Sequence, residues 1–169
     1  SMIWWAALGL SAAAVAYRLL AIWAVATWSP VEGPGWPAGT QVTVLKPLCG
    51  LDEGLYENLL SFLEQDYPAF ELVLGVADPR DPVLGLVERL RRAHPHAPIR
   101  LVVHGEDDVG ANPKVVSLIH MVRQASHELI LVSDSNVRAQ SGYLAAVAAE
   151  MQDPRVGLVT IVSVKTAKD

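Results

Sequence analysis

Residues 129–136 read Leu129-Ile-Leu-Val-Ser-Asp-Ser-Asn136, a short apolar run that ends abruptly in an acid. The run has the composition of a buried β-strand, and it delivers Asp134 and Asn136 to the point where that strand would emerge. In an open α/β sheet, ligands collect outside the carboxyl ends of the strands. A second run, Glu71-Leu-Val-Leu-Gly-Val-Ala-Asp78, ends in the same way. The two runs together predict a polar ligand site at one edge of a sheet.

Strand-like and helix-like patterns alternate along residues 41–164. Strands are predicted at 41–45, 71–77, 99–103, 128–133 and 156–164, and helices at about 52–65, from 81, from 113 and at about 141–151. We expect Lys46-Pro47 to stop the first strand. Because strands that alternate with helices are joined by right-handed crossovers, the predicted fold class is α/β, with a mainly parallel sheet and flanking helices.

The segment that precedes this alternation, residues 2–28, is almost entirely apolar and exceeds the roughly 20 residues that a bilayer span needs. Tryptophans near both of its ends fit interfacial aromatic belts, and Arg18 is expected to extend toward a headgroup layer. We therefore predict one N-terminal transmembrane helix; the alternative is a hydrophobic helix that docks on the following domain. A linker rich in proline and glycine is predicted at 29–40, and the main domain at 41–169.

Composition narrows the class of protein further. The formal net charge of −5 argues against nucleic-acid binding, which needs a basic surface. Cys49 is the single cysteine, so no disulfide can form within the chain. A reducing compartment is therefore favoured, and we predict that the domain after the transmembrane helix lies in the cytoplasm.

Four predicted loops carry the residues that could perform chemistry. The loops are Lys46-Pro-Leu-Cys-Gly-Leu-Asp52, Asp78-Pro-Arg-Asp-Pro82, Gly110-Ala-Asn-Pro-Lys114 and Asp134-Ser-Asn136. Taken singly, each could be structural, because Asp-Pro pairs start helices and an Asp after a strand is often an N-cap. In a parallel sheet all four loops would lie at one edge, and this combination favours a functional site.

The same motifs carry a resemblance to a known family. Val44-Leu-Lys-Pro-Leu-Cys-Gly50, Leu55-Tyr-Glu-Asn58, Gln65-Asp-Tyr-Pro68 and the last three loops above follow one another in a characteristic order. In this order and spacing, the chain resembles the membrane-bound inverting glycosyltransferases of the ceramide glucosyltransferase type, including the bacterial hopanoid-associated relatives. The resemblance covers roughly residues 41–160.

This resemblance implies a GT-A nucleotide-diphosphosugar transferase fold and a role for each site residue. Pro47 would belong to the first-strand loop beside the nucleotide base, and Asp78 would hydrogen-bond the uracil or the ribose. Lys114 would reach a phosphate as a point charge. Asp134 would hold the ribose or the water shell of a Mg²⁺ or Mn²⁺ ion, which would neutralise the departing diphosphate as a Lewis acid.

Two departures from the family pattern concern the metal and the base. Asn136 stands where many glycosyltransferases have the second acid of Asp-x-Asp. Its amide oxygen can still ligate a hard cation, but it is neutral, so a lower metal affinity is expected. The family's catalytic base is an acid further along the chain and is expected beyond Asp169, so the catalytic residue is unknown.

The sequence therefore predicts the donor-binding half of a glycosyltransferase that moves a sugar from a UDP-sugar to a lipid hydroxyl at a membrane. The alternative is a non-catalytic, membrane-anchored module that binds a nucleotide or another partner. A Rossmann-type oxidoreductase is disfavoured, because Lys46-Pro47 stands where a Gly-x-Gly-x-x-Gly turn would follow the first strand.

Overall fold

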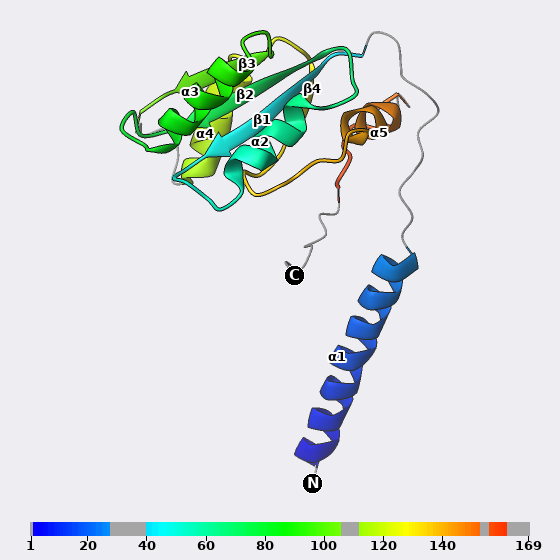
Figure 1. The fold of residues 1–169 in the computed structure, drawn as a ribbon. Coiled ribbons are helices and arrows are strands. Elements are labelled where there is room, and N and C mark those ends of the chain that lie inside the picture. Colours follow the sequence, from blue (N-terminus) through cyan, green and yellow to red (C-terminus); the bar gives the residue numbers. More distant parts are fainter. Residues whose placement is uncertain (1, 28–39, 106–111, 153–155, 162–169) are drawn as a thin grey trace. The chain divides into compact units, whose positions relative to one another are not determined.

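The computed structural model describes residues 2–27, 40–105, 112–152 and 156–161. The chain divides into two units, Ser1–Glu32 and Gly33–Asp169, which are described separately. Figure 1 shows a single helix in the first unit and a sheet flanked by helices in the second. The predicted linker falls almost wholly outside the described residues.

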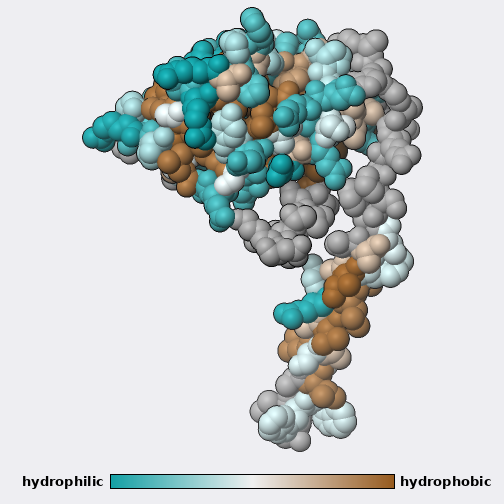
Figure 2. Space-filling model, in the orientation of Figure 1, coloured by the Kyte–Doolittle hydropathy of each residue, from teal (hydrophilic) through white to brown (hydrophobic). Residues whose placement is uncertain are grey.

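The first unit consists of helix α1 (Met2–Thr27), which confirms the predicted N-terminal helix. Large apolar side chains are exposed along it, from Trp4 at 77% to Val15 at 57%. Figure 2 shows hydrophobic surface along the middle of this helix. In the part of the chain that the structure describes, no helix has the length and the apolar character needed to cross a membrane. The prediction over residues 2–28 is thus correct for the helix and is not borne out for the transmembrane span.

The second unit is built on a four-stranded sheet in the order β3-β2-β1-β4. All three strand pairings are parallel, as predicted. In parallel sheets the carboxyl ends of all strands lie at the same edge, and the connecting helices cover the faces. The strands are β1 (Val42–Leu48), β2 (Phe70–Val76), β3 (Ile99–Val103) and β4 (Leu129–Val132).

Helices pack on both faces of this sheet because alternate strand residues point to opposite sides. Val44 and Leu74 belong to the larger core, which also contains buried side chains of three helices. Leu45 and Val73 belong to the smaller core on the other face, where Met121 packs. The larger core holds α2 (Leu55–Leu63), α3 (Val83–Ala93) and α5 (Tyr143–Glu150), and the smaller one holds α4 (Pro113–Val122).

The first strand is longer than predicted. It continues through Lys46 and Pro47 to Leu48, so Pro47 lies within the strand rather than in the loop that follows it. A proline cannot donate to the ladder and is tolerated where a strand lacks a neighbour. The register of β4 ends opposite Leu45, so β1 has a strand partner only on the β2 side at Pro47.

The fifth predicted strand is not formed over residues 156–161. The remaining residues of that prediction, 162–164, lie outside the described residues. Leu158 is 83% exposed, whereas Ile161 packs against the larger core. A segment forms a β-strand only when a neighbouring strand pairs with it. The apolar, β-branched composition of residues 156–161 was therefore not enough to predict a strand.

Candidate functional site: a cavity at the carboxyl edge of the sheet

The loops after β1, β2 and β4 and the first turns of α4 enclose a cavity of about 620 Å³. This size is within the range of small-molecule sites. Its position is the one at which open parallel sheets bind ligands. The lining residues are Pro47, Leu48, Cys49, Asp52, Ala77, Asp78, Asp81, Pro113, Lys114, Ser117, Asp134, Ser135 and Asn136.

All five site residues that the sequence singled out line this one cavity: Pro47, Asp78, Lys114, Asp134 and Asn136. They come from three strand ends and from a helix that starts more than thirty residues after Asp78. The expectation that the loops converge at one edge of the sheet is therefore met. The role of each residue toward a ligand stays a prediction.

Two residues of the cavity lining form an ion pair, through the Lys114 Nζ and the Asp134 Oδ1. Both side chains are about half exposed, at 50% and 56%. Lys114 is placed by the N-cap of α4, because the Asn112 side chain accepts hydrogen bonds from the backbone N–H groups of Lys114 (3.0 Å) and Val115 (3.4 Å). The Asp134 carboxylate, which we expected to attract a metal ion, is therefore already paired with the Lys114 ammonium.

Asp78 and Asp81 organise the turn after β2. The Asp78 Oδ1 accepts from the backbone N–H of Arg80 at 2.8 Å, which holds the pKa of Asp78 below its ordinary value. Asp81 accepts from the backbone N–H groups of Val83 at 2.8 Å and Gly50 at 2.9 Å, so it joins the start of α3 to the loop after β1. Gly50 has a φ of 69°, a conformation that favours glycine.

Lys46 was predicted to stop the first strand, but it lies inside β1. It lies fully buried in β1, and its ammonium sits 3.9 Å from the centre of the Phe62 ring. Burial lowers the pKa of Lys46 from 10.5 to about 7, and the nearby Asp134 carboxylate acts in the opposite direction. One signal was available in the sequence: a lysine within an apolar run that continues on both sides.

The charges around the cavity bear on which cofactor it could hold. Its lining carries four carboxylates, of Asp52, Asp78, Asp81 and Asp134, and one ammonium, of Lys114. An anionic diphosphate would be repelled by this set unless cations accompany it. No group of three or more His, Cys, Asp or Glu side chains suited to a metal ion occurs among the described residues. Asp134 and Asn136 fit a divalent ion that takes its other ligands from phosphate and water.

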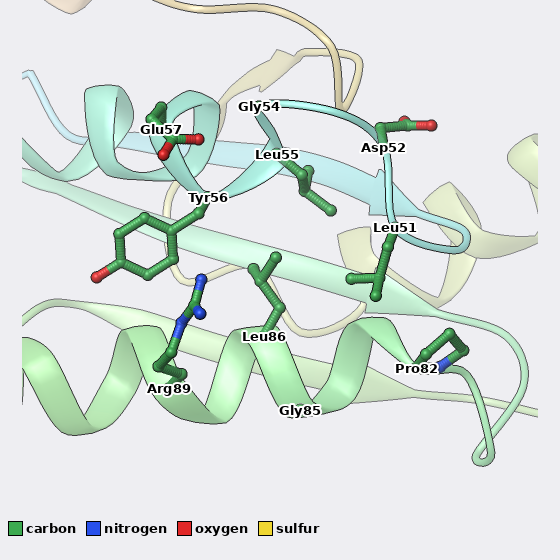
Figure 3. A pocket seen from close by; sticks show the side chains of 10 residues that line it. All are labelled: Leu51, Asp52, Gly54, Leu55, Tyr56, Glu57, Pro82, Gly85, Leu86 and Arg89. Atoms are coloured by element: carbon green, nitrogen blue, oxygen red, sulfur yellow. The ribbon is translucent and has the colours of Figure 1, made fainter.

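A second cavity, of about 420 Å³, lies between α2 and α3 (Figure 3). Leu55 of α2 and Leu86 of α3 extend into the space between the two helices, together with Leu51. The Arg89 guanidinium stacks 4.6 Å from the centre of the Tyr56 ring. This cavity is lined by none of the predicted site residues, so we assign the candidate ligand site to the larger one.

Residues 6–169 match the family described as glycosyl transferase family 21. A ceramide glucosyltransferase of Komagataella phaffii is 37% identical over 106 residues, which are 61% of this chain and 21% of that protein. Ceramide glucosyltransferase 3 of Caenorhabditis elegans is 35% identical over 120 residues, which are 70% of this chain and 26% of that protein. The chain thus spans 21% and 26% of the lengths of these two relatives.

Solved structures share the fold. The mannosyltransferase PcManGT from Pyrobaculum calidifontis, in complex with GDP-Man and Mn²⁺, superposes with a TM-score of 0.67 and 27% identity over 89% of this chain and 44% of that one. TarS 1–349 of S. aureus, in complex with UDP-GlcNAc, has a TM-score of 0.52 and 24% identity over 68% of this chain and 32% of that one. At this identity the second comparison concerns the fold alone.

Proposed function

Because the chain belongs to glycosyl transferase family 21, we propose that it forms the donor-binding part of an enzyme that transfers a sugar from a UDP-sugar to a lipid hydroxyl with inversion. The family resemblance inferred from the sequence motifs is confirmed by the match over residues 6–169. The observation that supports the proposal most directly is the convergence of Asp78, Lys114, Asp134 and Asn136 on one cavity.

In this proposal the uridine diphosphate lies across the cavity. Asp78 would accept a hydrogen bond from the uracil or the ribose. The hydrogen bonds that described residues make to Asp78 go to its Oδ1, so the Oδ2 is available for this contact. Pro47, at the end of the strand alongside, would pack beside the base. These contacts would orient the donor and would take no part in the chemical step.

The diphosphate would lie near Asp134, Asn136 and Lys114. Asp134 and Asn136 would hold a Mg²⁺ or Mn²⁺ ion, which neutralises negative charge that develops on the leaving diphosphate. Lys114 would exchange its partner from Asp134 to a phosphate oxygen. In support of a divalent ion, the structurally similar PcManGT was solved in complex with GDP-Man and Mn²⁺.

A lipid acceptor and membrane association are further parts of the proposal. The matched relatives are ceramide glucosyltransferases, whose name specifies a lipid acceptor. The described side chains of α1 include apolar residues that are more than half exposed, among them Leu8, Leu20 and Trp23. Burial of such side chains in lipid would be favourable, at about 25 cal/mol for each Å² removed from water.

Isothermal titration calorimetry tests the donor site. UDP with Mn²⁺ should bind the wild-type chain, and Asp134→Asn, which keeps the shape but removes the charge, should reduce the affinity at least tenfold. Asp66→Asn removes one carboxylate outside the cavity lining and should have no effect. Titration with GDP and Mn²⁺ tests the donor base, because the neighbour PcManGT holds GDP-Man. Binding of neither nucleotide would refute the proposed site and would leave the chain as an interaction module.

A further inference from the structure

The loop between β4 and α5, residues 133–142, is attached to the β1–α2 region largely by side chains. Two backbone hydrogen bonds add to them, from the Ser133 N–H to the Leu45 carbonyl and from the Asp66 N–H to the Ser141 carbonyl, each at 3.0 Å. The Asn58 Nδ2 donates to the Ser135 carbonyl at 3.2 Å, and the Ser61 Oγ accepts from the Ala139 N–H at 3.0 Å. The Gln65 Nε2 donates to the Gln140 carbonyl at 2.7 Å. The loop that carries Asp134 and Asn136 is therefore fixed on one side by the first strand-helix unit.

Lys46 makes the largest number of these contacts. Its Nζ donates to the Asp134 carbonyl at 2.7 Å, to the Ser133 Oγ at 3.0 Å and to the Val137 carbonyl at 3.3 Å. In its protonated form the Lys46 side chain has three N–H donors, and three acceptors surround it here. The Lys46 Nζ also lies over the Phe62 ring, 3.9 Å from its centre.

These acceptors surround the segment that bears the candidate ligands. Ser133 precedes Asp134, and Val137 follows Asn136; the Val137 N–H also donates to the Asp134 carbonyl at 3.2 Å. Because Lys46 holds carbonyl groups on both sides of this turn, it restricts the backbone from which the Asp134 carboxylate and the Asn136 amide project. Lys46 itself does not line the cavity.

We propose that Lys46 is a positioning residue, whose buried ammonium holds residues 133–137 so that the Asp134 and Asn136 side chains face the donor diphosphate and its metal ion. This inference rests on the proposed function, since it assigns Lys46 to the same site. A purely structural lysine would contribute stability and leave the affinity for the donor unchanged. Burial of a charge is costly unless it is fully hydrogen-bonded, and an apolar side chain of similar length could fill the same space.

The test compares variants of the full chain by calorimetric titration with UDP and Mn²⁺ and by amide hydrogen exchange. Lys46→Met keeps the length of the side chain and removes the ammonium. We expect at least a tenfold loss of affinity, together with faster exchange of the Val137 and Ala139 amides. Lys46→Arg keeps the charge and several donors, and should recover part of both losses.

Thr43→Val is the matched control, because Thr43 is equally buried in β1 but bonds to Glu71 at the opposite edge of the sheet, away from the cavity. It should lower the melting temperature and leave the affinity unchanged. If Lys46→Met does not fold, Ser133→Ala removes a single acceptor of the ammonium, and its effect on exchange in the loop decides the question.

Three outcomes can be distinguished. A folded Lys46→Met variant with wild-type affinity and wild-type exchange of the loop amides would overturn the inference. Equal losses of affinity in Lys46→Met and Thr43→Val would also overturn it, because they would reflect stability alone. If the wild type binds no nucleotide, the proposed function fails, and the exchange of the Val137 and Ala139 amides still shows whether Lys46 holds the loop.

Discussion

At the scale of single residues, the pairing of Lys114 with Asp134 determines how the cavity can take up a metal ion. The Lys114 ammonium contacts Oδ1 of the carboxylate that a divalent ion would use. Its positive charge would oppose the binding of a cation beside it, and a diphosphate that offers Lys114 another anionic partner would weaken this opposition. Binding of the metal and binding of the nucleotide should be coupled, each raising the affinity for the other.

Lys114→Met separates the two effects. Without its lysine partner, Asp134 is accessible, so the affinity for Mn²⁺ alone should rise several-fold. The affinity for UDP in the presence of Mn²⁺ should fall at least about tenfold, because a charge-assisted hydrogen bond to phosphate is lost, at about 1.5–3 kcal/mol. Titrations with Mn²⁺ alone and with UDP in excess Mn²⁺ measure both quantities.

Arg92→Met is the control for the change in net charge. Arg92 forms an exposed ion pair with Glu88 on α3 and does not line the cavity. This variant should bind Mn²⁺ and UDP like the wild type. A fall in the affinity of Lys114→Met for Mn²⁺ alone would show that Lys114 does not compete with the ion.

At the scale of secondary-structure elements, α4 approaches the sheet closely because β2 contains Gly75. A Cβ at this position would overlap with the Met121 Sδ and with the Ser117 Oγ. Ser117 also lines the cavity, and Lys114 lies one turn before it on the same helix. The absence of a side chain at residue 75 thus sets the distance at which α4 presents Lys114 to the loop after β4.

Gly75→Ala should destabilise the chain by about 1–3 kcal/mol, the usual cost of overpacking a core. The side chains that it meets come from α4, so the shift should also weaken UDP binding. Gly85→Ala is the opposite case: this glycine lies in α3 with nothing within 4 Å of an added Cβ, and the substitution should stabilise the helix by about 0.5–1 kcal/mol. Urea denaturation of both variants measures these changes. A Gly75→Ala variant as stable as the wild type would show that α4 moves away at no cost.

In the second unit as a whole, the buried Glu71 carboxylate links β2 to β1, to β3 and to the segment before β4. It lies at the edge of the sheet opposite the cavity. Glu71 of β2 accepts from Thr43 of β1 at 2.7 Å and from the Ser126 Oγ, before β4, at 3.0 Å. The Arg100 guanidinium of β3 lies 3.6 Å from the Glu71 Oε2, the oxygen that also accepts from the Ser126 hydroxyl. Burial alone would raise the pKa of Glu71, but the hydrogen bond from the Ser126 backbone N–H, those from the two hydroxyls and the Arg100 charge lower it below its ordinary value of 4.5.

The pH dependence of stability follows from the direction of this shift. A carboxyl group with a lowered pKa in the folded state stabilises the fold above pH 4.5, and this contribution is lost as the pH falls through the folded-state pKa. Glu71→Gln should therefore be less stable at pH 7, by about 1–3 kcal/mol, and should show a shallower loss of stability below pH 4.5. Glu88→Gln, at an exposed pair on α3, should change stability by less than about 0.5 kcal/mol. Urea denaturation between pH 3 and pH 7 makes the comparison.

Much of this architecture could be predicted because it depends on local patterns. Apolar runs followed by Asp78 and Asp134 identified two strand ends, and the alternation of strands and helices indicated parallel order. Pro47 and Lys46 were misplaced because their positions depend on where β4 stops and on acceptors that are about ninety residues away in sequence. The strand predicted from residue 156 failed for the related reason that pairing partners are not encoded in a single segment.

The exposed thiol of Cys49 has a practical consequence, because it lies on the wall of the larger cavity and the chain has no other cysteine. An alkylating reagent can therefore attach at one thiol only, and the adduct is a single mass increment. Any occupant that fills the space beside Cys49 shields the sulfur from the reagent. Alkylation of this native thiol thus reports occupancy of the cavity by mass spectrometry, without an introduced cysteine or an assay of sugar transfer.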